Sequence, residues 1–153
     1  MTAIDGSILV GTDGSSAAGA AVAQAVALAA AFGRRLLIVS AYAPGPAPPG
    51  LGSAAAHDPG AEPAWEMHAR DEALDLLSAA ERIARERGVA EVETLARVGD
   101  GADAILDVAE EQRCGLIVVG HTGLTGATRF LLGSVPNKVS HHAPCSVLIV
   151  RTG

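Results

Sequence analysis

The residues best suited to chemistry lie between positions 120 and 139, where the chain reads GHTGLTGATRFLLGSVPNKV. Two residues separate Gly120 from Gly123, nine separate Gly123 from Gly133, and Ser134 follows directly. Without a Cβ, Gly120 and Gly123 allow a ligand to approach the backbone closely. Gly133 and Ser134 open a predicted helix, whose free N–H groups and positive dipole end suit a phosphate. The spacing therefore predicts a phosphate cradle, the alternative being a long loop without a ligand.

The polar side chains of this segment leave more than one interpretation open. The Ser134 hydroxyl is placed either to donate to a phosphate oxygen or to cap the helix. Arg129 carries a positive charge that could reach the same anion. His121 is either catalytic or a solvated loop residue, and we favour the solvated residue. His141 and His142 are adjacent on the predicted helix and point about 100° apart, so we expect no metal site there.

The elements that must position these residues alternate along the chain. Short apolar runs predict strands, and longer segments without proline predict helices. The predicted strands are Ser7–Gly11, Arg35–Ala41, Val92–Val98, Leu116–Gly120 and Val147–Val150. The predicted helices are Ala17–Phe32, Trp65–Arg87, Asp100–Arg113 and Ser134–His142.

This alternation is typical of an α/β protein with an open parallel sheet and helices on both faces. Ligands in such proteins bind beyond the carboxyl ends of the strands. The loops after Gly11, Ala41 and Gly120 are therefore the expected place of a binding site. Val92–Val98 alternates apolar and polar residues and is predicted to be a half-exposed edge strand.

One long segment interrupts the pattern. Residues 44–63 are rich in Pro, Gly and Ala, which disfavours both a helix and a ladder and predicts a mobile loop. In the helix that follows, Leu74, Leu77, Ile83 and Ala84 recur near helical spacing and are predicted to form its apolar face. The length of 153 residues fits one domain, so we expect residues 1–153 to form a single domain that includes this loop.

The composition argues against several classes of function. The net charge is −6 and the basic residues are scattered, so the chain lacks the basic face of a nucleic-acid-binding protein. The longest weakly apolar stretch, Ala17–Phe32, is shorter than the roughly 20 residues of a membrane span. No N-terminal segment has the pattern of a secretory signal. We therefore expect a cytoplasmic protein without nucleic-acid or membrane partners.

The cysteines of the chain are Cys114 and Cys145, each just before a predicted strand. If those strands are parallel neighbours, the two Cα atoms would be roughly 5–7 Å apart, which allows a disulfide. The cytoplasm keeps thiols reduced, so we favour two free thiols over the disulfide.

The spacing Gly120-x2-Gly123-x9-Gly133-Ser134 resembles the ATP-binding motif of the universal stress protein family. Four further segments are similar to segments of that family: ILVGTDGS (Ile8–Ser15), LLIVSAY (Leu36–Tyr42), FLLGSV (Phe130–Val135) and HAPCSVLIVR (His142–Arg151). Together they extend over nearly the whole chain. The resemblance implies a Rossmann-like fold of the adenine nucleotide alpha hydrolase type, with five parallel strands in the order 3-2-1-4-5.

The resemblance also implies roles for individual residues. Asp13 would hold the ribose or adenine side of the nucleotide, the alternative being a cap of the following helix, and the backbone of Ala41 would meet the adenine edge. Gly120 and Gly123 would lie along the ribose and phosphates, and the helix start at Ser134 would hold the phosphates. With Arg129 added for its charge, the predicted nucleotide-binding residues are Gly11, Thr12, Asp13, Ala41, Gly120, Gly123, Arg129, Gly133, Ser134 and Val135.

By this resemblance the chain is an ATP-binding regulatory module of a stress response. Mg²⁺ would be carried by the phosphates, because no protein ligand set for a metal is visible. A slow ATPase or self-phosphorylating enzyme is one alternative, although the segment offers threonines and no carboxylate to activate water. A partner-binding protein of the same fold that takes no nucleotide is another. A dinucleotide oxidoreductase is disfavoured because GTDGSS (residues 11–16) lacks the G-x-G-x-x-G spacing.

The family also implies a homodimer. The last predicted strand lies within Ser146–Val150, and as an edge strand it would expose unpaired backbone groups. Pairing this strand with a second copy of the chain would cover those groups.

Overall fold

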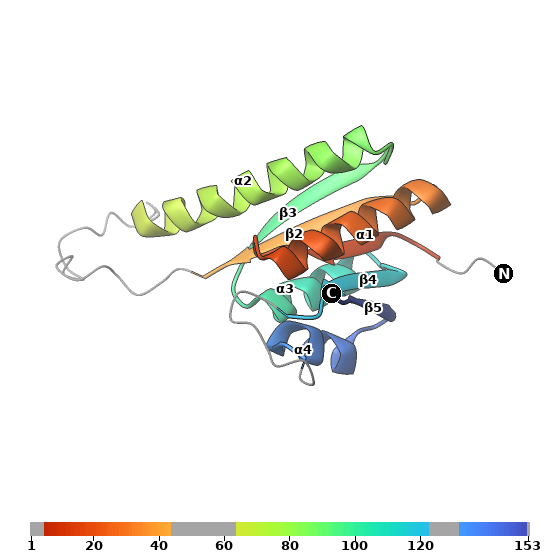
Figure 1. The fold of residues 1–153 in the computed structure, drawn as a ribbon. Coiled ribbons are helices and arrows are strands. Elements are labelled where there is room, and N and C mark those ends of the chain that lie inside the picture. The colour runs from red at the N-terminus through yellow and green to blue at the C-terminus, as the bar shows by residue number, and fades with distance from the viewer. Residues whose placement is uncertain (1–4, 44–63, 123–131, 153) are drawn as a thin grey trace.

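The computed structural model describes residues 5–43, 64–122 and 132–152. The elements follow the predicted order (Figure 1): β1 (Ile8–Gly11), α1 (Ser16–Phe32), β2 (Leu36–Tyr42), α2 (Ala64–Glu86), β3 (Val92–Val98), α3 (Gly101–Glu111), β4 (Leu116–Gly120), α4 (Ser134–His142) and β5 (Ser146–Val150). Their bounds differ from the predicted ones only at the ends. The predicted loop 44–63 lies outside the described residues.

The sheet confirms the predicted fold class and strand order. Its five parallel strands have the order β3-β2-β1-β4-β5, so β1 lies in the centre and β3 is an edge strand as predicted. The central strand is held in register from both sides, with Leu9 opposite Leu37 of β2 and Ile117 of β4.

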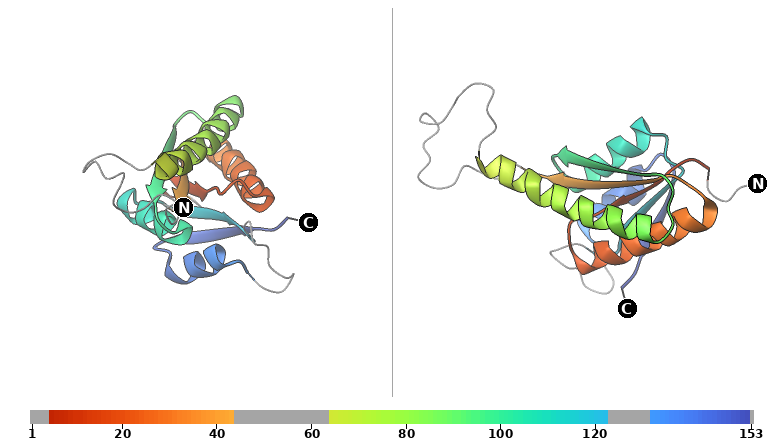
Figure 2. Two further views of the ribbon diagram at one scale, coloured as in Figure 1. Left: turned by 90° about the vertical axis from the view of Figure 1, so that its left-hand side faces the viewer. Right: turned by 90° about the horizontal axis from the view of Figure 1, so that it is seen from above.

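The helices cover the two faces of the sheet in pairs (Figure 2). α1 and α2 pack on the face that carries Ile8 and Val10, and α3 and α4 pack on the face that carries Leu9. These three side chains are fully buried. Because β1 is buried on both faces, its sequence is a continuous apolar run without alternation. The residues at the starts of α1, α3 and α4 lie near the carboxyl ends of the strands.

The buried face of α2 differs in part from the predicted one. Leu77 and Ala84 are buried as expected, but Leu74 and Ile83 are 44% and 43% exposed. The other buried positions of the helix are also small residues: Ala73 and Ala80. Alanine at these positions lets the helix backbone lie close to the strands, and the larger side chains then remain at the margin of the interface.

The ends of the helices follow their local sequence. Gly33 ends α1 in the left-handed conformation with φ 63°, as its place after an apolar helix predicted. α3 begins one residue later than predicted because Asp100 caps it from outside. It ends before Arg113, whose φ of 50° does not continue a helix. Among the described residues, no helix combines the length and apolarity that a membrane span requires.

Cys114 and Cys145 precede β4 and β5, which are parallel neighbours in the sheet. Both cysteines are free thiols, and Cys114 is buried while Cys145 is half-exposed. Burial raises the pKa of Cys114 to about 11, and the nearby Cys145 adds to the rise. Burial also raises the pKa of Cys145. Both side chains are therefore protonated, weakly nucleophilic thiols at neutral pH.

Candidate functional site

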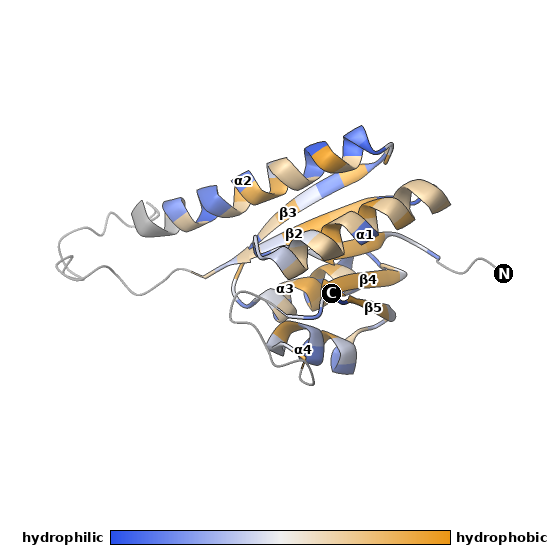
Figure 3. Ribbon diagram, in the orientation of Figure 1, coloured by the Kyte–Doolittle hydropathy of each residue, from blue (hydrophilic) through white to orange (hydrophobic). Residues whose placement is uncertain are grey.

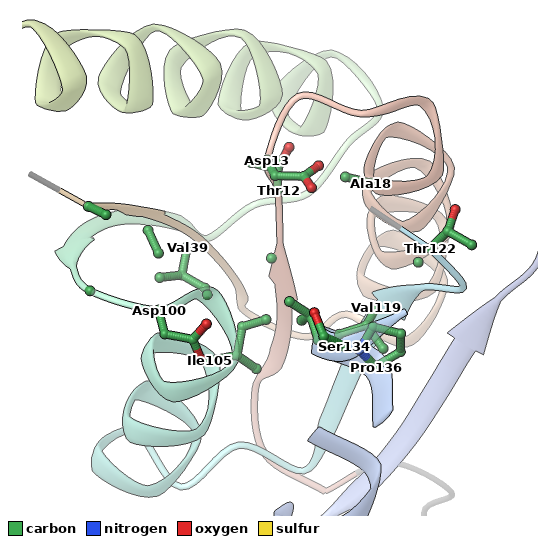
Figure 4. A pocket seen from close by; sticks show the side chains of 17 residues that line it. Thr12, Asp13, Ala18, Val39, Asp100, Ile105, Val119, Thr122, Ser134 and Pro136 are labelled. Atoms are coloured by element: carbon green, nitrogen blue, oxygen red, sulfur yellow. The ribbon is translucent and has the colours of Figure 1, made fainter. Parts of the chain in front are cut away.

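A cavity of about 440 Å³ opens at the carboxyl ends of β1, β2 and β4 (Figure 4). This is the switch point of the sheet, where the strand order runs from β1 to β2 on one side and to β4 on the other. Among the predicted nucleotide-binding residues, the cavity wall contains Gly11, Thr12, Asp13, Ala41, Gly120, Ser134 and Val135. The structure thus brings together residues that lie more than a hundred positions apart in the chain.

The other three predicted residues are not on the described wall. Gly133 is the residue just before α4 and its N–H donates to the carbonyl of His121 at 3.0 Å. Gly123 and Arg129 lie outside the described residues. His121 is not on the described wall.

The first loop of the cavity is folded by its own side chains. The Asp13 Oδ1 atom accepts a hydrogen bond from the Ser15 N–H at 2.9 Å, and the Thr12 N–H donates to the Val39 carbonyl at 2.9 Å. The cap of α1 is Ser15, whose hydroxyl accepts from the Ala18 N–H at 3.1 Å. Asp13 therefore does not cap α1, and its Oδ2 atom has no hydrogen-bond partner among the described residues.

Three helices begin at this cavity, and they differ in whether a side chain caps the first turn. The start of α1 is capped by the Ser15 hydroxyl. The start of α3 is capped by the carboxylate of Asp100, which accepts from the Asp103 N–H at 3.2 Å. The start of α4 follows Gly133, which has no side chain to cap it. α4 is the one of these three helices whose first turn is left without a side-chain acceptor.

The free donors of α4 can be named. The Asn137 N–H donates to the Gly133 carbonyl at 3.1 Å, and Pro136 has no N–H. The N–H groups of Ser134 and Val135 have no partner among the described residues. Ser134 is the first residue of the helix, and its hydroxyl does not cap it, which removes one of the two predicted interpretations of that residue. Two backbone donors and one hydroxyl are thus available at the positive end of a helix.

Glycine at position 120 has a packing reason. A Cβ on Gly120 would lie 2.7 Å from the carbonyl oxygen of Ala17 in α1, closer than real Cβ contacts. The close contact between α1 and the end of β4 therefore requires glycine whether or not a ligand is bound. At Gly11 a Cβ would lie 2.6 Å from the Cδ1 atom of Ile105, a flexible side chain of the cavity wall.

The sequence interpretation missed one part of the wall, the loop from Gly99 to Gly101 after β3. β3 is the edge strand beside β2, so its carboxyl end reaches the same edge of the sheet. The Gly99 N–H donates to the Tyr42 carbonyl at 2.9 Å and holds the loop against the end of β2. The Gly-Asp-Gly sequence directly before a predicted helix was the signal that could have revealed it.

The wall has both apolar and polar residues. Val39, Ala41 and Ile105 are apolar residues of the wall, and Ser134 at the start of α4 is one of its polar residues. Figure 4 shows Val39, Ile105 and Ser134 around the cavity. Asp13 and Asp100 are the acidic residues of the described wall. The part of the chain that the structure describes contains no cluster of three or more His, Cys, Asp or Glu that could hold a metal ion.

An open parallel sheet with a cavity at its carboxyl edge defines a doubly wound α/β protein with a ligand-binding switch point. The chain belongs to the universal stress protein family, because the model of that family matches residues 6–151. Universal stress protein Rv1636 of Mycobacterium tuberculosis is 36% identical over 145 residues, 95% of each chain. A universal stress protein of Thermus aquaticus is 40% identical over 149 residues, 94% of this chain and 97% of the relative.

Solved structures agree with this family. A universal stress protein in complex with cAMP is 30% identical, with a TM-score of 0.72 and coverage of 97% of this chain and 98% of the other. UspA from Lactobacillus plantarum is 27% identical, with a TM-score of 0.79 and coverage of 98% and 100%. The universal stress protein of Archaeoglobus fulgidus in complex with dAMP is 26% identical, with a TM-score of 0.63 and coverage of 95% and 98%.

Proposed function

We propose that the cavity binds an adenine nucleotide, with ATP as the physiological ligand, and that the protein is a regulatory module of a stress response in the cytoplasm. The phosphates would lie at the start of α4 and the base against the apolar wall beside β2. We further propose that residues 1–153 act as one domain.

The observation that carries the proposal is the uncapped start of α4. A helix start offers donors and positive dipole character to an anion, unless a side chain already occupies it. The starts of α1 and α3 are occupied by Ser15 and Asp100. Ser134 and Val135 lie on the cavity wall, and their N–H groups have no partner among the described residues. A phosphate placed there would satisfy both donors and could accept from the Ser134 hydroxyl.

The opposite side of the cavity suits the base. Most ligand cavities are largely apolar with a few placed polar groups, and the wall of Val39, Ala41 and Ile105 next to Asp13 has this character. The free Oδ2 atom of Asp13 can accept a hydrogen bond from a ribose hydroxyl or an exocyclic amine. The solved relatives with cAMP and with dAMP both contain an adenine nucleotide, which supports this class of ligand.

Binding is proposed over efficient turnover. A phosphoryl-transfer site needs a group that positions the attacking water or hydroxyl. Asp13 and Asp100, the acidic residues of the described wall, are both engaged in local hydrogen bonds to backbone N–H groups. Slow hydrolysis or phosphate transfer to a hydroxyl remains the second candidate, with Thr122 and Ser134 on the wall as acceptors. Mg²⁺ would enter with ATP, held by phosphate oxygens.

The test is calorimetric titration of ATP, with and without Mg²⁺, into nucleotide-free wild-type protein and two proline variants. Ser134→Pro removes the N–H and the hydroxyl at the first position of α4, where proline is well tolerated, and Gly133 already has the extended conformation that precedes proline. Ser16→Pro is the matched control, because Ser16 begins α1 after an extended Ser15 and is not on the cavity wall.

We expect one ATP site per chain. Ser134→Pro should lower the affinity for ATP by about tenfold or more, since a hydrogen bond to a charged group contributes about 1.5–3 kcal/mol. Ser16→Pro should bind like wild type. If both variants bound ATP as wild type does, the phosphate site would not be at the start of α4.

A folded wild-type protein that takes up no ATP would favour the partner-binding alternative. Gly120→Ala is a poor test, because its effect would include the clash with α1. Rapid release of labelled phosphate would overturn the ranking of binding over turnover.

We also propose that the protein is a homodimer paired through β5. Its residues Val147 to Val150 are apolar and only half-buried although they belong to the sheet. Among the described residues no strand pairs with the outer side of β5. Sedimentation that shows only monomer at micromolar concentration would contradict this assignment.

A further inference from the structure

The proposed phosphate site has a negative charge beside it. Asp100 lies on the cavity wall together with the first residues of α4, and its carboxylate caps α3. The side chain of Asp100 is 56% exposed, so its charge is screened by water but not removed. An anionic ligand at the start of α4 would share the cavity with this carboxylate.

A single cation from α4 faces this carboxylate in the described part of the chain. Lys138 is the only lysine of the sequence and lies one turn after Ser134. Its Nζ atom is 2.6 Å from Oδ1 of Asp103 and 3.7 Å from Oδ2 of Asp100. Asp103 thus anchors the ammonium group beside Asp100, and the two carboxylates raise the pKa of Lys138. Lys138 is not on the cavity wall.

We propose that Lys138 is a positioning residue that makes the cavity accept a charged nucleotide, by neutralising the Asp100 carboxylate and holding it at the cap of α3. This proposal rests on the proposed nucleotide site. Without Lys138, Asp100 would repel each phosphate at the start of α4, and the free carboxylate could turn toward the two free donors of Ser134 and Val135. With Lys138 in place, one of the two negative charges at the start of α3 is compensated before the ligand arrives.

A purely structural role of Lys138 would have a different signature. An ion pair that only ties α4 to α3 would, when removed, loosen the cavity for every ligand alike. A charge-balancing role acts in proportion to the charge of the ligand, so it weakens ATP more than AMP and leaves uncharged adenosine unchanged. It also depends on Asp100, whereas a tie through Asp103 does not.

The experiment compares adenosine, AMP and ATP by calorimetric titration at low salt without divalent metal. The variants are Lys138→Gln, Lys138→Arg, Asp100→Asn and the double variant Lys138→Gln/Asp100→Asn. Asparagine keeps the capping oxygen of Asp100 and removes the charge. Arg85→Gln is the matched control, because Arg85 forms an exposed ion pair with Glu81 on α2, away from the cavity.

We expect Lys138→Gln to lower the affinity for ATP about three- to tenfold and the affinity for AMP by less. The affinity for adenosine should stay within twofold, because the charge effect is modest and screened by water. Lys138→Arg should restore ATP binding, and the double variant should recover most of the loss. Equal weakening of adenosine and ATP, or a loss that persists in the double variant, would overturn the proposal in favour of a structural tie. If the folded wild type bound ATP and adenosine but Lys138→Gln had no effect, only this proposal would fail. If wild type bound neither, the proposed function would fail with it.

Discussion

The two edges of the sheet are finished in different ways. Charged side chains on and beside β3 form ion pairs. Arg97 of β3 pairs with Glu111 of α3 at 2.6 Å, and Arg35 pairs with Glu91 and with Glu93 of β3. The long helix α2 lies over this side of the sheet (Figure 1). At β5 the strand is almost entirely hydrophobic, and its residues are half-exposed (Figure 3).

This difference indicates which edge is open to a partner. Charged residues on an edge strand disfavour pairing with another strand, because pairing would bury or crowd the charges. An apolar edge has no such barrier, and a second strand would bury its side chains and satisfy its backbone groups. The ion pairs at β3 and the apolar residues of β5 thus support the proposed pairing of the homodimer through β5 rather than through β3. Four experiments test this comparison.

The largest effect, on the free energy of unfolding, is expected for a buried residue of α2, the helix that covers the β3 side of the sheet. Leu77 is 1% exposed and shares a core cluster with Leu36 of β2 and Val92 of β3. Leu77→Ala should lower the free energy of unfolding by about 2–5 kcal/mol, because it leaves a cavity in this cluster. Leu74→Ala, at an exposed position of the same helix, should change it by less than about 0.5 kcal/mol. Urea unfolding measures both, and similar losses would show that α2 packs differently.

The next effect concerns the β5 edge. Leu148→Lys places a charge in the half-exposed apolar strand, so we expect the dimer dissociation constant to rise about 10- to 100-fold. The matched change on the other edge, Thr94→Lys in β3, should leave the oligomeric state as it is. Analytical ultracentrifugation of both variants, with circular dichroism to show that they fold, decides the point. Dissociation by both changes, or by neither, would remove the distinction between the edges.

Cys145 reports on the same edge, since it precedes β5 and is half-exposed. Its raised pKa keeps it protonated at pH 7, so alkylation should be slower than for a cysteine with an ordinary pKa and should accelerate as the pH rises. Cys114, with a pKa of about 11 and a buried side chain, should react more slowly still. If a second chain covers β5, dilution should speed the reaction at Cys145. A rate at Cys145 that stays constant while sedimentation shows dissociation would place the partner elsewhere.

The smallest effect is expected at the β3 ion pair. The Arg97 guanidinium donates to Glu111 and lowers the pKa of that carboxyl below its ordinary value. A lowered pKa contributes stability above the ordinary pKa, and this contribution is lost as the pH falls through the lowered value. Arg97→Gln should therefore destabilise slightly at pH 7 and hardly at all in acid. Arg82→Gln, an exposed position of α2, is the control. A difference from wild type that grows in acid would contradict the assigned pair.

The alternation of elements was predictable because it depends on local patterns. Apolar runs of strand length, alanine-rich segments and glycine after helices each indicate an element from its own neighbours in the chain, and all elements were confirmed. The buried face of α2 was not predictable from spacing alone. Leu74 and Ile83 fit a helical period, but the side chains that are buried beside Leu77 are those of alanines. Which side of the helix is buried depends on the surface of the sheet against which the helix packs.

The candidate site shows the same division. The spacing of glycines and Ser134 pointed to the carboxyl edge of the sheet, and the cavity is there. Asp100 was missed because its loop follows an edge strand, and only the packing of β3 beside β2 brings that strand end to the cavity. The reason for glycine at position 120 was incomplete, because the carbonyl of Ala17 is distant in sequence and close only after α1 packs on β4.

By itself the sequence determined the order of the elements and the family, and it predicted a helix that starts at Ser134. These depend on local propensity and on a motif of fixed spacing. Only the tertiary structure decided that Asp100 lies on the cavity wall, that Lys138 reaches it from another helix, and that one edge of the sheet is charged and the other apolar. Those features arise between segments far apart in the chain, and their distances exist only once the sheet and helices are packed.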